Sequence, residues 1–118
     1  MQETALRETY EELGLPPELT RIIGALTPLY VPPSNFCVYP IVGTLQERPV
    51  YMTRPKEVAE VIETPLDHLL DKRNLRKEIW TRGQQEVKVP FYYFGGHKIW
   101  GATAMILAEF LEIVRSSK

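Results

Sequence analysis

The strongest constraint on structure lies near the N-terminus, where an amphipathic pattern stops at a glycine and two prolines. Three apolar side chains recur at i, i+4 and i+7 and so share one stripe of a helix: Leu6, Tyr10 and Leu13. Gly14 follows where helices commonly end in a left-handed residue, and Pro16 and Pro17 cannot continue the helix. We therefore predict a helix over residues 2–13 that buries this stripe.

Three carboxylates cluster on the face of this helix opposite the apolar stripe: Glu8, Glu11 and Glu12. Like charges at these spacings weaken a helix by about 0.2–0.5 kcal/mol per pair. One interpretation is a solvated acidic face. The other is a site for a divalent cation such as Mg²⁺, which prefers oxygen ligands and would offset the repulsion. The spacing alone leaves both interpretations open.

Composition narrows the classes of function. The chain has 118 residues, enough for one domain with a hydrophobic core, and a formal net charge of −1, which gives no electrostatic case for binding nucleic acid or an anionic membrane. The single cysteine, Cys37, permits no intrachain disulfide and fits a reducing, cytoplasmic setting. No apolar run approaches the roughly 20 residues that span a bilayer, and we see no leader sequence.

The remaining pattern alternates between strand-like and helical segments. Strands are expected at 21–26, 36–45, 50–53, 58–63, 87–94 and 97–100, the last two joined by Gly95-Gly96. Helices are expected at 66–70 and 102–115. The proline-rich segment 26–36 is expected to form a stiff loop, and segment 72–86 a long loop around a short element near Ile79-Trp80. This order predicts an α+β or α/β sandwich with a mixed sheet between helices.

The segment ETALRETYEELGL resembles the second half of the Nudix signature, R-E-U-x-E-E-x-G-U, where U is aliphatic. Six specified positions fall in register: Arg7, Glu8, Glu11, Glu12, Gly14 and Leu15. Thr9 departs from the pattern at the first U position. LTPLYVPPSNFCVYPIVG, EVAEVIETPLDHLLD and HKIWGATAMIL are similar to segments of coenzyme A diphosphatase-type Nudix proteins, so the resemblance covers most of the chain.

Only six residues precede Arg7. We therefore expect residues 1–118 to form a partial Nudix domain that lacks the family's glycine loop, first signature glutamate and leading strands. Loss of those strands would turn interior strands into edges and uncover part of the apolar stripe, which favours pairing with another chain. We accordingly expect a homo-oligomer, with its contact near the first helix and the exposed sheet edge.

The resemblance implies a metal-dependent hydrolase of a nucleoside diphosphate linked to another group, with a small-molecule nucleotide as substrate and Mg²⁺ or Mn²⁺ as cofactor. Glu8, Glu11 and Glu12 would be the metal ligands and, with Arg7, the catalytic residues. In the family the arginine orients a glutamate that is absent here, and Glu3 at i−4 is a candidate replacement. For coenzyme A, cleavage at the diphosphate would give phosphopantetheine and an adenosine bisphosphate.

Other residues carry weaker expectations. Five can line the substrate side or simply form a structural loop: Tyr30, Pro33, Ser34, Asn35 and Phe36. Three carboxylates are candidates for an additional base, and none stands out: Glu63, Glu78 and Glu86. Two alternative functions also remain open. One is a Nudix hydrolase of ADP-ribose or another nucleotide, and the other is an inactive Nudix-fold module for binding or assembly.

Overall fold

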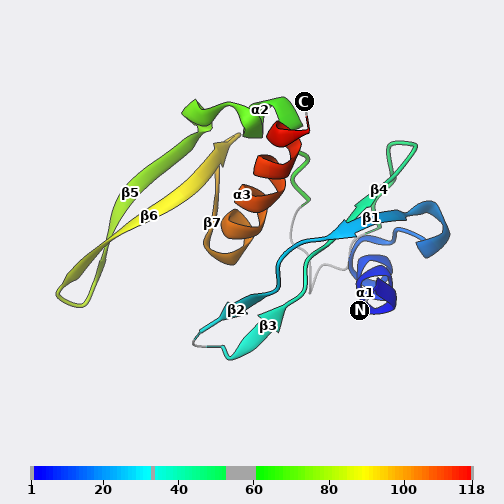
Figure 1. The fold of residues 1–118 in the computed structure, drawn as a ribbon, viewed down its shortest axis with the longest axis horizontal. Coiled ribbons are helices and arrows are strands. Elements are labelled where there is room, and N and C mark those ends of the chain that lie inside the picture. The colour runs from blue at the N-terminus through cyan, green and yellow to red at the C-terminus, as the bar shows by residue number, and fades with distance from the viewer. Residues whose placement is uncertain (1, 33, 53–60, 118) are drawn as a thin grey trace. The chain divides into compact units, whose positions relative to one another are not determined.

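The computed structural model describes residues 2–32, 34–52 and 61–117. The chain falls into two compact units, residues 1–62 and residues 63–118 (Figure 1). Each unit is described by itself. The prediction that the chain forms one domain remains a prediction.

The first unit begins with helix α1, Gln2–Leu13, as predicted. The helix ends at Gly14, which has a φ of 74° and donates its N–H to the Tyr10 carbonyl at 2.9 Å. The predicted burial of the apolar stripe is only partly right. Leu6 and Leu13 are half-buried, but Tyr10 is 53% exposed, and no residue of α1 is fully buried.

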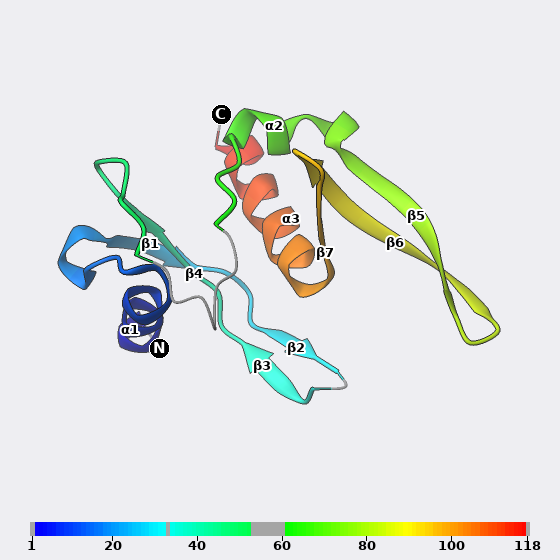
Figure 2. The ribbon, with the colours of Figure 1, turned by 180° about the vertical axis from the view of Figure 1, so that it is seen from behind.

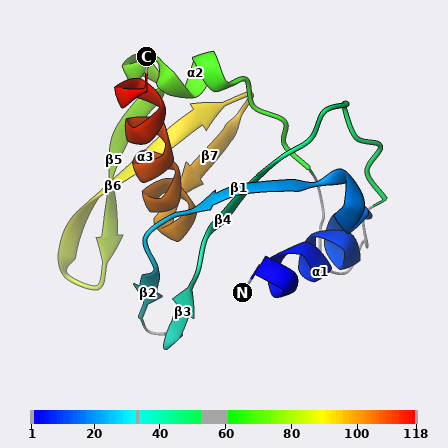
Figure 3. The same cartoon turned by 45° about the vertical axis from the view of Figure 1, so that its right-hand side comes forward.

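Two antiparallel strand pairs follow a 3-10 turn at Pro17–Leu19 in the first unit (Figure 3). Strands β1, Arg21–Ala25, and β4, Ile41–Thr44, form one pair. The register shifts between Ile22 and Gly24, which marks a β-bulge in this pair. The predicted strand over residues 36–45 is interrupted near Pro40, because proline cannot donate a ladder hydrogen bond.

The predicted loop at 26–36 is wrong, because the chain forms a β-hairpin there. Strand β2, Leu29–Val31, pairs with β3, Phe36–Val38. The prolines at 28 and 32 lie just outside the paired residues, where no ladder donor is required. The strands expected at 50–53 and 58–63 are absent from the described residues 50–52 and 61–63, and the rest of both segments lies outside the described ranges.

The second unit contains a three-stranded antiparallel sheet in the order β5-β6-β7 (Figure 2). Its strands are β5, Leu75–Arg82, β6, Gln85–Phe94, and β7, His97–Trp100. The Gly95-Gly96 hairpin is confirmed, with positive φ at both glycines. The long loop predicted at 72–86 is wrong, because residues 75–82 pair with residues 85–92 around a two-residue turn at Gly83.

Two helices pack on this sheet. Helix α2, Leu66–Leu70, has the predicted bounds, and α3, Gly101–Ser116, extends the predicted helix by one residue at each end. The core of the unit is formed by four buried side chains: Leu69, Tyr92, Ala104 and Leu111. Leu111 is fully buried, and the Arg115 guanidinium ties the end of α3 to the Leu70 carbonyl of α2 at 3.1 Å.

The architecture is therefore α+β, as predicted at the coarser level. The finer prediction of a single mixed sheet between helices is not met by the described residues. All their strand pairs are antiparallel, and they form three separate small sheets.

Candidate metal and catalytic site

The three signature carboxylates project from the exposed face of α1. Glu8, Glu11 and Glu12 are all exposed. At about 100° per residue, Glu8 and Glu12 lie within about 40° of each other around the helix axis, one turn apart, and Glu11 lies beside them. This donor set has the hard oxygen chemistry that Mg²⁺ and Mn²⁺ prefer.

Arg7 forms an ion pair with Glu11 on the next turn, with Nε 3.9 Å from Oε1. The pairing suggested with Glu3 does not occur among the ion pairs of the described residues. Because both side chains of the observed pair are about half exposed or more, its contribution to stability is small. Its consequence is positional, since it draws the Glu11 carboxylate along the helix toward Arg7.

The carboxylates of α1 are not gathered into a preformed metal cage. Within residues 2–32, 34–52 and 61–117, no group of three or more histidine, cysteine, aspartate or glutamate side chains is arranged to hold a metal ion. The assignment of Glu8, Glu11 and Glu12 as metal ligands, and of Arg7 as catalytic, therefore stays a prediction. Its support is the donor chemistry and the common helix face.

Four of the predicted substrate residues lie in or next to the β2–β3 hairpin: Tyr30, Ser34, Asn35 and Phe36. Asn35 adopts a left-handed conformation, with a φ of 64°, and its side-chain oxygen accepts a hydrogen bond from the Tyr30 hydroxyl. The Ser34 hydroxyl donates to the Val31 carbonyl at 2.7 Å. Phe36 is 70% exposed, and Pro33 lies outside the described residues. The polar groups of the hairpin tip are thus engaged in the turn itself, and the Phe36 ring remains available to a ligand.

A cavity of about 840 Å³, which sequence analysis missed, adjoins the C-terminal end of α1. Its lining includes Gly14, Leu15, Thr20, Arg21, Thr44 and Glu47. The Thr20 hydroxyl oxygen is buried and has no hydrogen-bond partner among the described residues. The cavity depends on residues 14–21 meeting residues 44–50, so no local sequence pattern indicates it.

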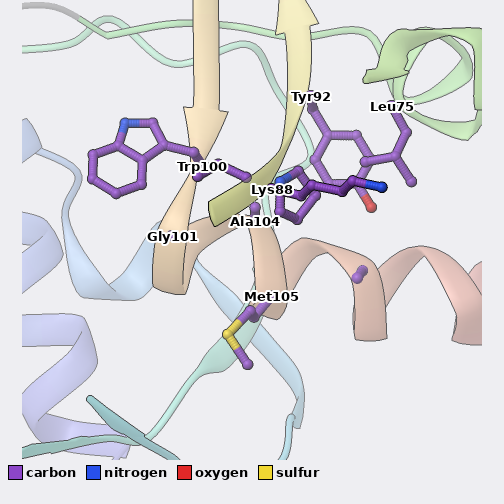
Figure 4. Close-up of a pocket in the computed structure, with 10 residues that line it drawn as sticks. Leu75, Lys88, Tyr92, Trp100, Gly101, Ala104 and Met105 are labelled. Carbon is purple, nitrogen blue, oxygen red and sulfur yellow. The ribbon is translucent and has the colours of Figure 1, made fainter. Parts of the chain in front are cut away.

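A second cavity, of about 300 Å³, lies in the second unit between β6 and α3 (Figure 4). It is largely apolar, with Tyr92, Trp100, Ala104 and Met105 in its wall and Lys88 as its charged member. Burial raises the pKa of the Tyr92 phenol, an effect that the nearby positive charge of Arg115 partly offsets. Neither the signature residues Arg7, Glu8, Glu11 and Glu12 nor the predicted substrate residues of the first unit line this cavity.

Among the candidate bases, Glu78 has a structural role in the β5–β7 sheet. Its carboxylate accepts hydrogen bonds from Lys98 Nζ at 2.9 Å and from the Trp80 indole N–H at 2.6 Å. These bonds, the Lys98 bond foremost, lower the pKa of Glu78. A carboxylate held in its ionised form by two donors is a weak proton acceptor, which makes Glu78 the least suitable of the three candidates. Glu86 is exposed on β6. The Glu63 residue already takes part in an interaction within the chain.

Comparisons with known proteins support the signature. An uncharacterized Nudix hydrolase, NudL, from Photorhabdus laumondii is 36% identical over 113 residues, which cover 95% of this chain and 59% of the relative. The human mitochondrial coenzyme A diphosphatase NUDT8 is 36% identical over 114 residues, 94% of this chain and 48% of that protein. Nudix hydrolase 22, chloroplastic, from Arabidopsis thaliana is 33% identical over 117 residues, 94% of this chain and 38% of the relative. No protein-family model matches the chain.

These matches show that the chain belongs to the Nudix hydrolase family. Within the family its sequence is coenzyme A diphosphatase-like, because proteins with that name are among its relatives in two mammals. The chain spans about half the length of the curated relatives it matches. No helix in the described part of the chain is both long enough and apolar enough to cross a membrane.

Proposed function

We propose that this chain carries the metal-binding helix of a Nudix diphosphatase that cleaves coenzyme A or its thioesters at the diphosphate. The observation that carries the proposal is the register Arg7-Glu8-x-x-Glu11-Glu12-x-Gly14, which puts the three glutamates on the exposed face of α1. The chain is also related to a coenzyme A diphosphatase over 94% of its length. Glu8, Glu11 and Glu12 would hold Mg²⁺ or Mn²⁺, and Arg7 would orient Glu11.

The roles of these residues follow from their positions on α1. Glu8 and Glu12 stand one turn apart, so they can contribute oxygens to the same ion without distorting the helix. The bound metal would neutralise charge on the diphosphate and lower the pKa of an attacking water. The Tyr30–Phe36 hairpin tip offers the exposed aromatic ring of Phe36 for stacking on an adenine base.

A metal titration tests this proposal. Mn²⁺ added to the chain is expected to broaden the NMR signals of residues in α1, since the ion is paramagnetic, and Glu11→Gln with Glu12→Gln should abolish the effect. Glu3→Gln is the matched control, because Glu3 lies about 140–180° around the helix from Glu8 and Glu12. Unchanged broadening in the Glu11/Glu12 double variant would refute the metal assignment.

The substrate is tested separately by incubating the chain, and a form extended to the full length of its relatives, with coenzyme A, acetyl-coenzyme A and ADP-ribose. Release of phosphopantetheine from coenzyme A is the expected result. Hydrolysis of ADP-ribose without hydrolysis of coenzyme A would reassign the substrate within the family. Metal binding without turnover of any of the three by the extended form would favour a binding module.

A further inference from the structure

Strand β6 is much longer than β7, the strand that pairs with one of its two edges (Figure 1). Strand β5 pairs with residues 85–92 of β6, whereas β7 pairs only with residues 91–94. On the β7 side, residues 85–90 therefore have no strand partner among the described residues. An unpaired edge of this length is a template for another extended chain.

The register shows which backbone groups point out of this edge. Both hairpins have two-residue loops, so the residues that flank each loop form a hydrogen-bonded pair: Arg82 with Gln85, and Phe94 with His97. Because bonded pairs alternate along an antiparallel ladder, odd-numbered residues of β6 bond to β5 and even-numbered residues face the β7 side. The free edge thus presents the N–H and C=O groups of Glu86 and Lys88.

Pro90 follows the same alternation. It is even-numbered, so its missing N–H falls on the free side, and the β5–β6 ladder loses no hydrogen bond. This position explains how a ten-residue strand tolerates an internal proline. It also confines the usable donors of the free edge to Glu86 and Lys88.

The side chains of this stretch favour a second copy of the same chain as the occupant. Glu86, Val87 and Lys88 are all exposed, Val87 by 43%. An antiparallel pair of β6 strands centred on Val87 sets Glu86 of each chain directly opposite Lys88 of the other. The two Val87 side chains then meet at the centre, and the four outward N–H groups all find carbonyl partners. Opposite charges in directly facing positions stabilise such pairs.

The competing symmetric register is less favourable. Centring the pair on Lys88 places two lysines directly opposite each other and faces Glu86 with Pro90, which cannot donate. Charge and donor positions therefore select the register centred on Val87.

We infer that β6 pairs with β6 of a second copy along residues 85–89, in an isologous antiparallel arrangement centred on Val87. The contact is distinct from the one expected near α1, since it uses only the second unit. An interface of this size is small, so we expect a dissociation constant on the order of 10–100 µM.

A charge exchange tests the register. Lys88→Glu sets like charges opposite each other and should weaken dimerisation at least about tenfold in sedimentation velocity across a dilution series. Glu86→Lys combined with Lys88→Glu restores opposite pairs and should restore the dimer. Lys72→Glu, with the same change of charge at an exposed position outside the strands, should leave the dimer unchanged. Circular dichroism checks that each variant folds.

Amide hydrogen exchange gives a second readout. The N–H groups of Glu86 and Lys88 should become protected as the chain concentration rises, whereas that of Val87, bonded to β5, should be protected at every concentration. A chain that stays monomeric up to about 500 µM would overturn the inference. A dimer that is insensitive to Lys88→Glu but lost on Tyr10→Ser would equally overturn it, in favour of α1.

Discussion

Gly14 lies directly against Met52. A Cβ atom placed on Gly14 would stand 2.6 Å from the Cβ of Met52, closer than two such carbons approach in real proteins. The Met52 N–H donates to the Leu13 carbonyl at 2.8 Å, and this bond satisfies one of the carbonyl groups that the end of a helix leaves free. The signature glycine therefore ends α1 and also permits the chain at residue 52 to close on that end.

Gly14→Ala is expected to destabilise the chain for two separable reasons. The left-handed conformation at this position costs a non-glycine residue about 1–2 kcal/mol, and the clash with Met52 adds about 1–3 kcal/mol. Gly83→Ala is the matched control, because Gly83 has a similar φ of 63° with nothing within 4 Å of an added Cβ. Urea unfolding followed by circular dichroism measures both. Equal losses in the two variants would show that Met52 does not matter.

The core of the second unit depends on Leu111. This side chain is fully buried beside Leu69, Tyr92 and Ala104, so Leu111→Ala should lower the free energy of unfolding by about 2–5 kcal/mol. Ile113→Ala, on the same helix at a position 49% exposed, should cost well under that. The chain's two tryptophans, Trp80 and Trp100, both lie in this unit, so their fluorescence reports its unfolding. Similar losses for the two variants would contradict this core assignment.

Asp71 should titrate at unusually low pH. The Arg73 guanidinium, which bonds both carboxylate oxygens, together with the Arg73 backbone N–H, lowers the pKa of Asp71 from 3.8 to about 2. Because the folded state favours the ionised form, this contribution to stability is present above pH 3.8 and is lost as the pH falls toward about 2.

An NMR titration of the Asp71 carboxyl carbon measures this pKa directly. Arg73→Gln should raise it toward 3.8, because the variant removes the largest cause of the shift. Arg76→Gln, which removes a cation that lies over the Tyr93 ring instead, should leave it unchanged. A value for Asp71 near 3.8 in the unmodified chain would show that the contact with Arg73 does not persist in solution.

The sequence predicts the elements whose signals are local. Glycine, proline and apolar periodicity within a few residues indicate three of them: the end of α1, the whole of α2 and the hairpin at Gly95-Gly96. Strand β5 escaped prediction for a physical reason. Most of its side chains are exposed on both faces, so it shows no alternation of apolar and polar residues. The strand predicted at 87–94 runs through Pro90 and misses only Gln85 and Glu86, two polar residues that begin β6 without an alternating apolar pattern.

The functional features of the chain likewise divide into those with a local sequence pattern and those without one. The signature residues Arg7, Glu8, Glu11 and Glu12 could be identified because their spacing within one helix is a local property. The cavity beside Thr20 and the free edge of β6 could not, because each arises where segments distant in sequence meet. The sequence also contained no indication of the role of Glu78, because its partner Lys98 is twenty residues further along the chain.

The proposed metal site makes a kinetic prediction. Glu12→Gln keeps the size of the side chain and removes one ligand charge, so it should lower kcat for coenzyme A by about a hundredfold or more and change KM little. A metal held by these residues would stabilise charge that grows in the transition state, which is why the loss should fall mainly on kcat. Glu3→Gln, on the other side of α1, should leave both parameters unchanged. Mn²⁺-induced broadening of α1 signals should weaken in parallel with kcat, which separates a lost ligand from a misfolded helix. Equal kcat values for Glu12→Gln and Glu3→Gln would remove Glu12 from the catalytic machinery.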